Sequence, residues 1–113
     1  MPKHLRIVVS TFRSTREAGR VARAIVADGL AACANIVPVR SVYLWKGSLE
    51  DGREAMVFFK VGSRSVRRLK AELGRRHPYE VPEILELAVE SVNPEYLRWA
   101  EASRPRRKVT PRE

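Results

Sequence analysis

The spacing of the apolar residues changes along this chain in an order that few folds can accommodate. Over residues 5–10 apolar side chains recur at every second position, which predicts a strand. Over residues 15–28 they recur at intervals of three and four, which predicts an amphipathic helix. Ser14 and Glu17 have the spacing of a capping box, and Gly29 stands where a left-handed residue would end the helix.

The middle of the chain predicts a long hairpin. Residues 31–46 form one extended segment that contains Pro38, and a proline in a strand belongs on an edge or at a bulge because it has no backbone N–H. We expect the turn within residues 47–52, where Asp51-Gly52 is a strong turn dipeptide. The return strand covers residues 53–61, so both arms exceed the usual length of about five or six residues.

The last part of the chain predicts a further helix, strand and helix. The second helix is expected over residues 65–76, and a connector with two prolines follows over residues 77–83. Alternating apolar residues over 85–90 predict the fourth strand. Asn93 and Pro94 have the residue types that begin a helix, so we expect a short terminal helix after them.

This order, β-α-β-β-α-β plus a terminal helix, predicts an α+β protein of the ferredoxin-like class. Such a protein packs two helices on one face of a four-stranded antiparallel sheet. A chain of 113 residues has room for one such core. We expect residues 1–103 to form this single domain and residues 104–113 to be a basic, disordered tail.

The net charge of +9 is unevenly distributed along the chain. Residues 60–76 carry seven Lys/Arg and one acid, and residues 104–113 carry five Lys/Arg and one acid. The remainder is nearly neutral, so the sequence lacks a broad basic face with interleaved aromatic residues, and a nucleic-acid partner is not expected.

Cysteine content and hydropathy bear on where the protein works. One cysteine cannot form an intrachain disulfide, and no apolar stretch approaches the ~18 residues of a membrane helix. The first residues show no signal-peptide pattern, so we expect a cytoplasmic protein with no membrane partner.

The sequence is also poor in amide side chains. It contains no Gln, its two Asn stand at positions 35 and 93, and Arg outnumbers Lys by 17 to 5. A scarcity of thermolabile amides is typical of heat-adapted proteins, which predicts a thermostable protein. A GC-rich genome would also favour Arg, and the sequence leaves both explanations open.

Few side chains could bind a metal or carry out chemistry. Cys33 lies in an apolar run, so it is either a small buried residue or a soft thiolate ligand. The connector begins with His-Pro-Tyr-Glu at 77–80, which could form a rigid binding site or could simply cap the helix and steer the chain. Tyr43 and Trp45 share one face of the hairpin, a pattern more typical of an interface than of a ligand site.

Four blocks of this sequence resemble the CutA family of divalent-cation tolerance proteins. In chain order the blocks are LAACANIVP at 30–38, SVYLWKG at 41–47, HPYEVPEI at 77–84 and NPEYLRW at 93–99. HPYEVPE is the most specific of them, and the likeness spans about residues 5–102. It implies a homotrimer of ferredoxin-like subunits whose long hairpins pair between neighbours, much as in PII-type signalling proteins.

The resemblance also implies a role in the tolerance of divalent cations, with copper the metal most often named. Cys33 and His77 fall on the family's recurring Cys and His, and Glu80 could supply an oxygen ligand, so these three are the expected metal ligands. The other residues expected in the cleft between subunits are Tyr79, Glu83 and Trp45.

Two positions depart from what some bacterial relatives carry. A further Cys in the first strand and a second His beside the HPYE histidine are replaced here by Ser10 and Arg76. We therefore expect copper, or another divalent cation, to bind weakly.

Two other functions fit the sequence less well. Ferredoxin-like sheets can bind RNA, but the strand expected over 53–61 lacks the aromatic RNA-recognition pattern. No acid/base pair argues for an enzyme. The sequence favours a non-enzymatic, metal-response or signalling-type binding protein, with a nucleic-acid-binding module as the alternative.

Overall fold

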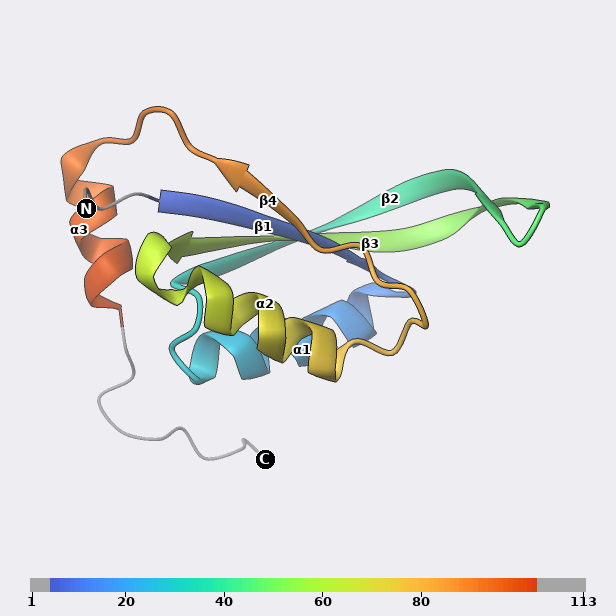
Figure 1. Cartoon of the computed structure of the whole chain (residues 1–113), viewed down its shortest axis with the longest axis horizontal. Coiled ribbons are helices and arrows are strands. Elements are labelled where there is room, and N and C mark those ends of the chain that lie inside the picture. The colour runs from blue at the N-terminus through green and yellow to red at the C-terminus, as the bar shows by residue number, and fades with distance from the viewer. Residues whose placement is uncertain (1–4, 104–113) are drawn as a thin grey trace.

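The computed structural model describes residues 5–103, so the tail expected over 104–113 lies outside the described residues. The elements appear in the expected order (Figure 1). The strands are β1 (Leu5–Phe12), β2 (Cys33–Trp45), β3 (Ser48–Gly62) and β4 (Leu85–Ala88), and the helices are α1 (Thr15–Ala27), α2 (Val66–Arg76) and α3 (Pro94–Ala102), with a 3-10 turn over Ser63–Ser65.

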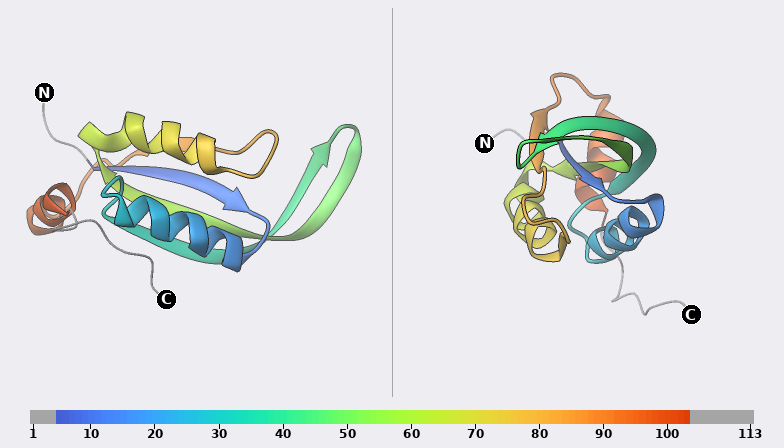
Figure 2. Two further views of the ribbon diagram at one scale, coloured as in Figure 1. Left: turned by 90° about the horizontal axis from the view of Figure 1, so that it is seen from below. Right: turned by 90° about the vertical axis from the view of Figure 1, so that its right-hand side faces the viewer.

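The sheet has four strands in the order β2-β3-β1-β4, and every neighbouring pair is antiparallel. Helices α1 and α2 lie side by side on one face of it, and α3 lies at the end of the sheet where β1 begins (Figure 2). The predicted ferredoxin-like α+β class is confirmed. Among residues 5–103 no helix is long and apolar enough to span a bilayer.

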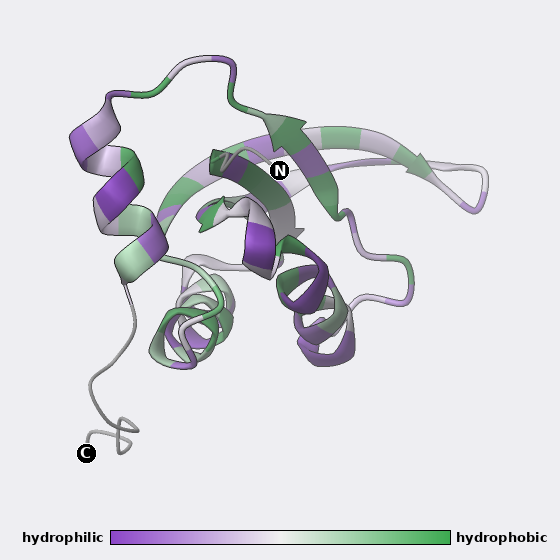
Figure 3. Cartoon of the chain, turned by 60° about the vertical axis from the view of Figure 1, so that its left-hand side comes forward, coloured by the Kyte–Doolittle hydropathy of each residue, from purple (hydrophilic) through white to green (hydrophobic). Residues whose placement is uncertain are grey.

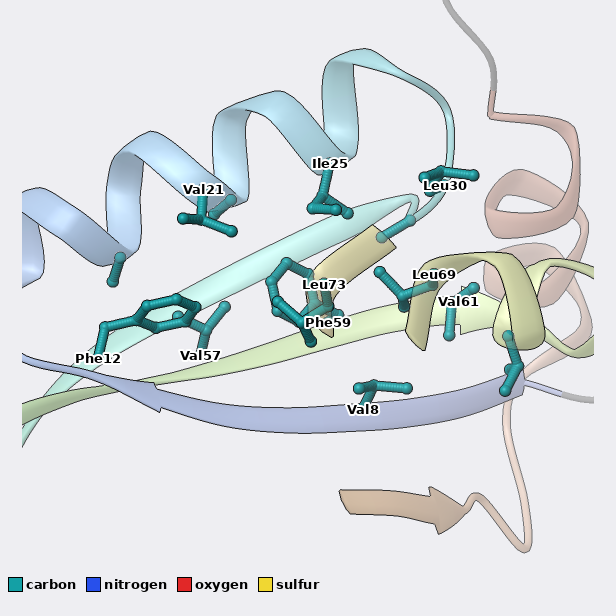
Figure 4. Packing of buried hydrophobic residues seen from close by; sticks show 14 of the residues in the cluster. Val8, Phe12, Val21, Ile25, Leu30, Val57, Phe59, Val61, Leu69 and Leu73 are labelled. Atoms are coloured by element: carbon teal, nitrogen blue, oxygen red, sulfur yellow. The ribbon is translucent and has the colours of Figure 1, made fainter. Parts of the chain in front are cut away.

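The core fills the space between this helical layer and the sheet (Figure 4). Alternate residues of β3 point into it: Ala55, Val57, Phe59 and Val61 are all buried. Fully burying one large apolar side chain contributes roughly 1.5–3 kcal/mol, so this layer supplies most of the fold's stability. The other side chains that fill it include Val8 and Phe12 of β1, Ile25 of α1, and Leu69 and Leu73 of α2.

Helix α1 begins and ends close to the predicted residues. Ser14 caps it by accepting a hydrogen bond from the Glu17 N–H at 3.1 Å, and Gly29 has the left-handed φ of 76°. The reciprocal bond differs from the predicted capping box. Oε1 of Glu17 accepts from the Arg13 N–H at 3.1 Å, one residue before the cap, because the Arg13 guanidinium also binds this carboxylate.

The hairpin turn lies earlier than the sequence predicted. The two strands pair without interruption from Cys33–Lys60 to Trp45–Ser48, so Lys46 and Gly47 form the turn and Asp51-Gly52 lies inside β3. The prediction of a turn at Asp51-Gly52 was wrong. Lys46 and Gly47 both have positive φ, as a primed two-residue turn requires, and Arg40 holds Asp51 in the ladder by two hydrogen bonds of 2.8 Å.

Pro38 lies within this ladder, opposite Ala55. It is tolerated because β2 is an edge strand, which confirms the edge alternative and excludes the bulge. The distal half of the hairpin extends past the helical layer and bends, as the left view of Figure 2 shows.

The sheet face opposite the helices remains apolar. Register places odd-numbered residues of β2 and even-numbered residues of β3 on this open face, and Leu85 and Leu87 of β4 pair with Val9 and Ile7 there. Both leucines are about half exposed, at 50% and 46%. Apolar residues also continue along the hairpin in Figure 3.

The ends of the last two elements differ slightly from prediction. Strand β4 ends at Ala88, so it is shorter than the alternating pattern over 85–90 suggested. Pro94 occupies the first turn of α3 as expected, but the Asn93 side chain makes no capping hydrogen bond.

Candidate functional site

The segment 77–83 is fastened to the end of β1 by His77. The Tyr79 N–H donates to Nδ1 of His77 at 3.1 Å, so the ring proton is on Nε2. Nε2 lies 2.9 Å from the Thr11 carbonyl oxygen, to which it donates, and 3.1 Å from Oγ of Ser10. Burial lowers the pKa of His77, which keeps the imidazole neutral.

Cys33 lies far from this histidine. It begins β2 opposite Lys60, whereas Thr11, which His77 contacts, is opposite Met56. Four positions along β3 correspond to about 13 Å, and β1 and β2 flank β3 on opposite sides. Cys33 is partly exposed on the open face, not buried in the core, and Sγ lies 3.6 Å from Oδ1 of Asn35.

The three predicted metal ligands therefore do not converge within one chain. Both ring nitrogens of His77 are already hydrogen-bonded, and Glu80 is exposed with Oε1 3.7 Å from Nζ of Lys46. Over residues 5–103 no three His, Cys, Asp or Glu side chains form a group that could hold a metal ion. The donor set that these described residues of one chain provide does not fit a copper ion.

The remaining predicted cleft residues do come together. Trp45, Tyr79, Glu80 and Glu83 line a cavity of about 610 Å³ between the bent hairpin and the segment 77–83. We call it the hairpin cavity. Most of its strand residues lie on the apolar sheet face, because the register places Ser41, Tyr43 and Trp45 of β2 and Glu54 of β3 there; the other lining residues include Thr11, Arg13 and Val42.

Two polar pairs hold the walls of the hairpin cavity. The Tyr79 hydroxyl donates to Oε2 of Glu54 at 2.5 Å, and burial together with this carboxylate raises the pKa of Tyr79. Nη2 of Arg13 donates to Oε2 of Glu17 at 2.7 Å, and the Arg13 guanidinium lowers the pKa of this carboxyl. The ring of His77 packs edge-on against the ring of Tyr79, with centroids 4.8 Å apart, and so helps to hold Tyr79 in place.

Sequence reasoning missed Arg13 and Glu54 as site residues and assigned Tyr43 to an interface. Glu54 lies in β3 directly before the residues that alternate into the core. A carboxylate next to such an apolar run was the signal that could have identified it. Arg13, which directly follows β1, gave no signal in the sequence.

The arrangement of elements and sequence blocks can be compared with known proteins. A family model described as CutA1 divalent ion tolerance protein matches residues 6–103. The chain belongs to the CutA1 family. This confirms the resemblance of the four sequence blocks, and the matched residues include the whole of the described sheet except Leu5.

Relatives in the CutA1 family come from distant organisms. Protein CutA of Mus musculus is 41% identical over 90 residues, which are 79% of this chain and 51% of the mouse protein. The divalent-cation tolerance protein CutA of Thermus thermophilus is 38% identical over 94 residues, 82% of this chain and 91% of that protein. The chain thus spans about half the length of its mouse relative.

A solved structure supports the same fold. The PII-like protein CutA from Nostoc sp. PCC 7120 superposes with a TM-score of 0.83 at 30% identity, covering 87% of this chain and 95% of the Nostoc chain. The likeness to a PII-like CutA agrees with the split βαβ order of the sheet. None of these three proteins is named for nucleic-acid binding.

Proposed function

We propose that this CutA1-family protein acts in the cellular response to divalent cations as a homotrimeric, PII-like binding protein, with a ligand site in the hairpin cavity. It works in the cytoplasm by binding, not by catalysis. The family model and the relatives support the link to divalent cations. The hairpin cavity supports the ligand site, because four of the six residues expected at the subunit cleft line it.

The observation that carries this proposal is the apolar surface that one chain leaves uncovered. Val42, Leu44 and Leu49 of the hairpin are 59%, 73% and 71% exposed. The open sheet face adds Leu85 and Leu87, and apolar patches of this kind mark interaction surfaces. Long unpaired edges such as β2 invite pairing with another chain. A closed trimer would cover both features.

We do not expect a tight copper site in this protein. Because Cys33 and His77 do not meet within one chain, we derive no tight copper site from them. The protein would respond to divalent cations through its assembly and its cavity ligand, and direct copper binding would be weak.

The test is the mass of the assembly in solution. Size exclusion with light scattering is expected to give three times the 12.9 kDa mass of the chain. Leu87→Glu, on the open face, should break the trimer, whereas Ala71→Glu, exposed on α2, should leave it intact. A wild-type protein that is monomeric at micromolar concentration would overturn the proposal.

A further inference from the structure

The hairpin cavity carries an excess of negative charge between aromatic walls. Its carboxylates are Glu54, Glu80 and Glu83, and its rings are Tyr43, Trp45 and Tyr79. Among the described residues that line it, the one guanidinium is that of Arg13, which is already bound to Glu17. An anion would meet three carboxylates there, so this composition disfavours it.

The protein's own Lys46 shows which chemistry suits the mouth of this cavity. Nζ of Lys46 lies 5.4 Å from the centroid of the Trp45 ring and 3.7 Å from Oε1 of Glu80. A cation within about 6 Å of an aromatic face is attracted by the ring's quadrupole. The ammonium thus sits between a ring and a carboxylate, at the point where the hairpin tip meets the segment 77–83.

This internal contact is weak enough to be replaced. The side chains of Lys46 and Glu80 are 69% and 70% exposed, and exposed ion pairs contribute little because water screens them. A ligand that brought its own cation and filled the cavity beyond would gain the same ring and carboxylate, together with burial of its apolar part.

We propose that the hairpin cavity binds an organic cation, an ammonium or guanidinium group on an apolar body, with its charge between Trp45 and Glu80 in place of the Lys46 ammonium. The apolar body lies against Tyr43 and Tyr79. A volume of about 610 Å³ is in the range of small-molecule sites. A bare metal ion fits less well, because no group of three ligating side chains exists over residues 5–103. This inference takes the location of the site from the proposed function and adds the class of its ligand.

Fluorescence of Trp45 provides the test. The chain has two tryptophans, so Trp99→Phe leaves Trp45 as the sole reporter in the intact protein. We would titrate this protein with phenethylammonium and, separately, with 3-phenylpropionate, which has a similar body and the opposite charge. A saturable change with the ammonium is expected, with at least roughly tenfold weaker binding of the carboxylate. Equal affinities, or a response that never saturates, would overturn the proposal.

Variants at the mouth of the cavity give the sharper result. Lys46→Ala removes the internal competitor, so the affinity for phenethylammonium should rise roughly two- to fivefold. Glu80→Gln should lower that affinity by a similar factor, while Glu90→Gln, exposed beyond β4, should not change it. Weaker binding by Lys46→Ala, or unchanged binding by Glu80→Gln, would contradict the assignment. A trimer that does not bind the ammonium overturns this inference and leaves the trimeric assembly of the proposed function standing, whereas a monomer overturns the proposed function itself.

Discussion

The ring of His77 stacks on the ring of Phe12, with centroids 4.3 Å apart and planes 14° from parallel. Phe12 is fully buried at the end of β1, and His77 is the first residue after α2. The stack, with the bond from Nε2 to the Thr11 carbonyl, joins the segment 77–83 to the core. The HPYE histidine therefore anchors the segment 77–83 to β1 in this chain.

Replacing this histidine should destabilise the protein without abolishing folding. His77→Ala removes a buried ring and leaves the Thr11 carbonyl without its donor, so we expect a loss of about 2–4 kcal/mol in the free energy of unfolding. Chemical denaturation measures this. Tyr79→Phe, which loses only the hydroxyl bond to Glu54, serves as a milder comparison. Equal stabilities of wild type and His77→Ala would contradict the role.

Stability should also depend on pH through His77. Burial lowers the pKa of His77 below its ordinary value of 6.5, although Thr11 and the charges of Glu17 and Glu54 act in the opposite direction. The unfolded chain then binds a proton more readily than the folded one, so stability falls as the pH drops below about 6.5. One proton gives a slope of at most about 1.4 kcal/mol per pH unit.

The measurement is the unfolding free energy between pH 7.5 and 5.5, before most carboxylates titrate. The wild-type curve should be flat at the upper end and should fall at the lower end, and His77→Gln should remove most of that fall. Parallel curves for the two proteins would show that another group is responsible.

The hairpin turn allows a matched pair of glycine substitutions. Gly47 and Gly52 both have open space where a Cβ would be, but Gly47 has φ +81° and Gly52 lies in β3. Gly47→Ala should therefore cost about 1–2 kcal/mol through left-handed strain. Gly52→Ala should be neutral or slightly stabilising, because it reduces the freedom of the unfolded chain. Thermal melts of both variants distinguish backbone strain from packing.

Copper affinity should not depend on the two residues that the sequence singled out. Wild type, Cys33→Ala and His77→Ala are expected to bind Cu(II) equally and no more tightly than about micromolar, because the two side chains lie apart. Calorimetric titration checks the affinity, and a parallel melt separates loss of stability from loss of binding. Loss of copper binding in a variant that stays folded would indicate a site shared between subunits.

The amide-poor composition predicts a midpoint of thermal unfolding above about 90 °C. Two small ion-pair networks agree with this: Glu72 binds Arg75 and Arg76, and Glu86 binds Arg6 and Lys70. Calorimetry at two protein concentrations would measure the midpoint, which should rise with concentration if the protein is oligomeric. A midpoint near 60 °C would leave genome composition as the explanation.

Local patterns predicted the elements well, since their causes are local. The start of α1 depends on Ser14, its end on Gly29, and the place of Pro38 at an edge on the missing N–H, all of which the sequence displays. The wrong turn came from a choice between two local signals. Asp51-Gly52 is the stronger turn dipeptide, but a turn at Lys46-Gly47 lets β2 and β3 pair without interruption along their full length.

The site was harder to predict because its parts meet through long-range geometry. Trp45 and Glu80 approach each other because the hairpin bends toward the segment 77–83, and the bend leaves no mark in the spacing of apolar residues. The same geometry separates Cys33 from His77, which their shared chemistry had suggested as partners. Composition identifies possible ligands, and only the register decides which of them can meet.

The strand order has a consequence for how the chain is made. Among the strands of residues 5–103, β1 is synthesised before the other three and lies inside the finished sheet, whereas β4, its partner on one side, is synthesised after them. Until Leu85 is available to pair with Val9, this edge of β1 has no β4 strand beside it. During translation the nascent chain thus exposes an unpaired edge on β1 in addition to the edge on β2, and such edges can pair with other chains. Completion of the sheet depends on the four-residue strand β4.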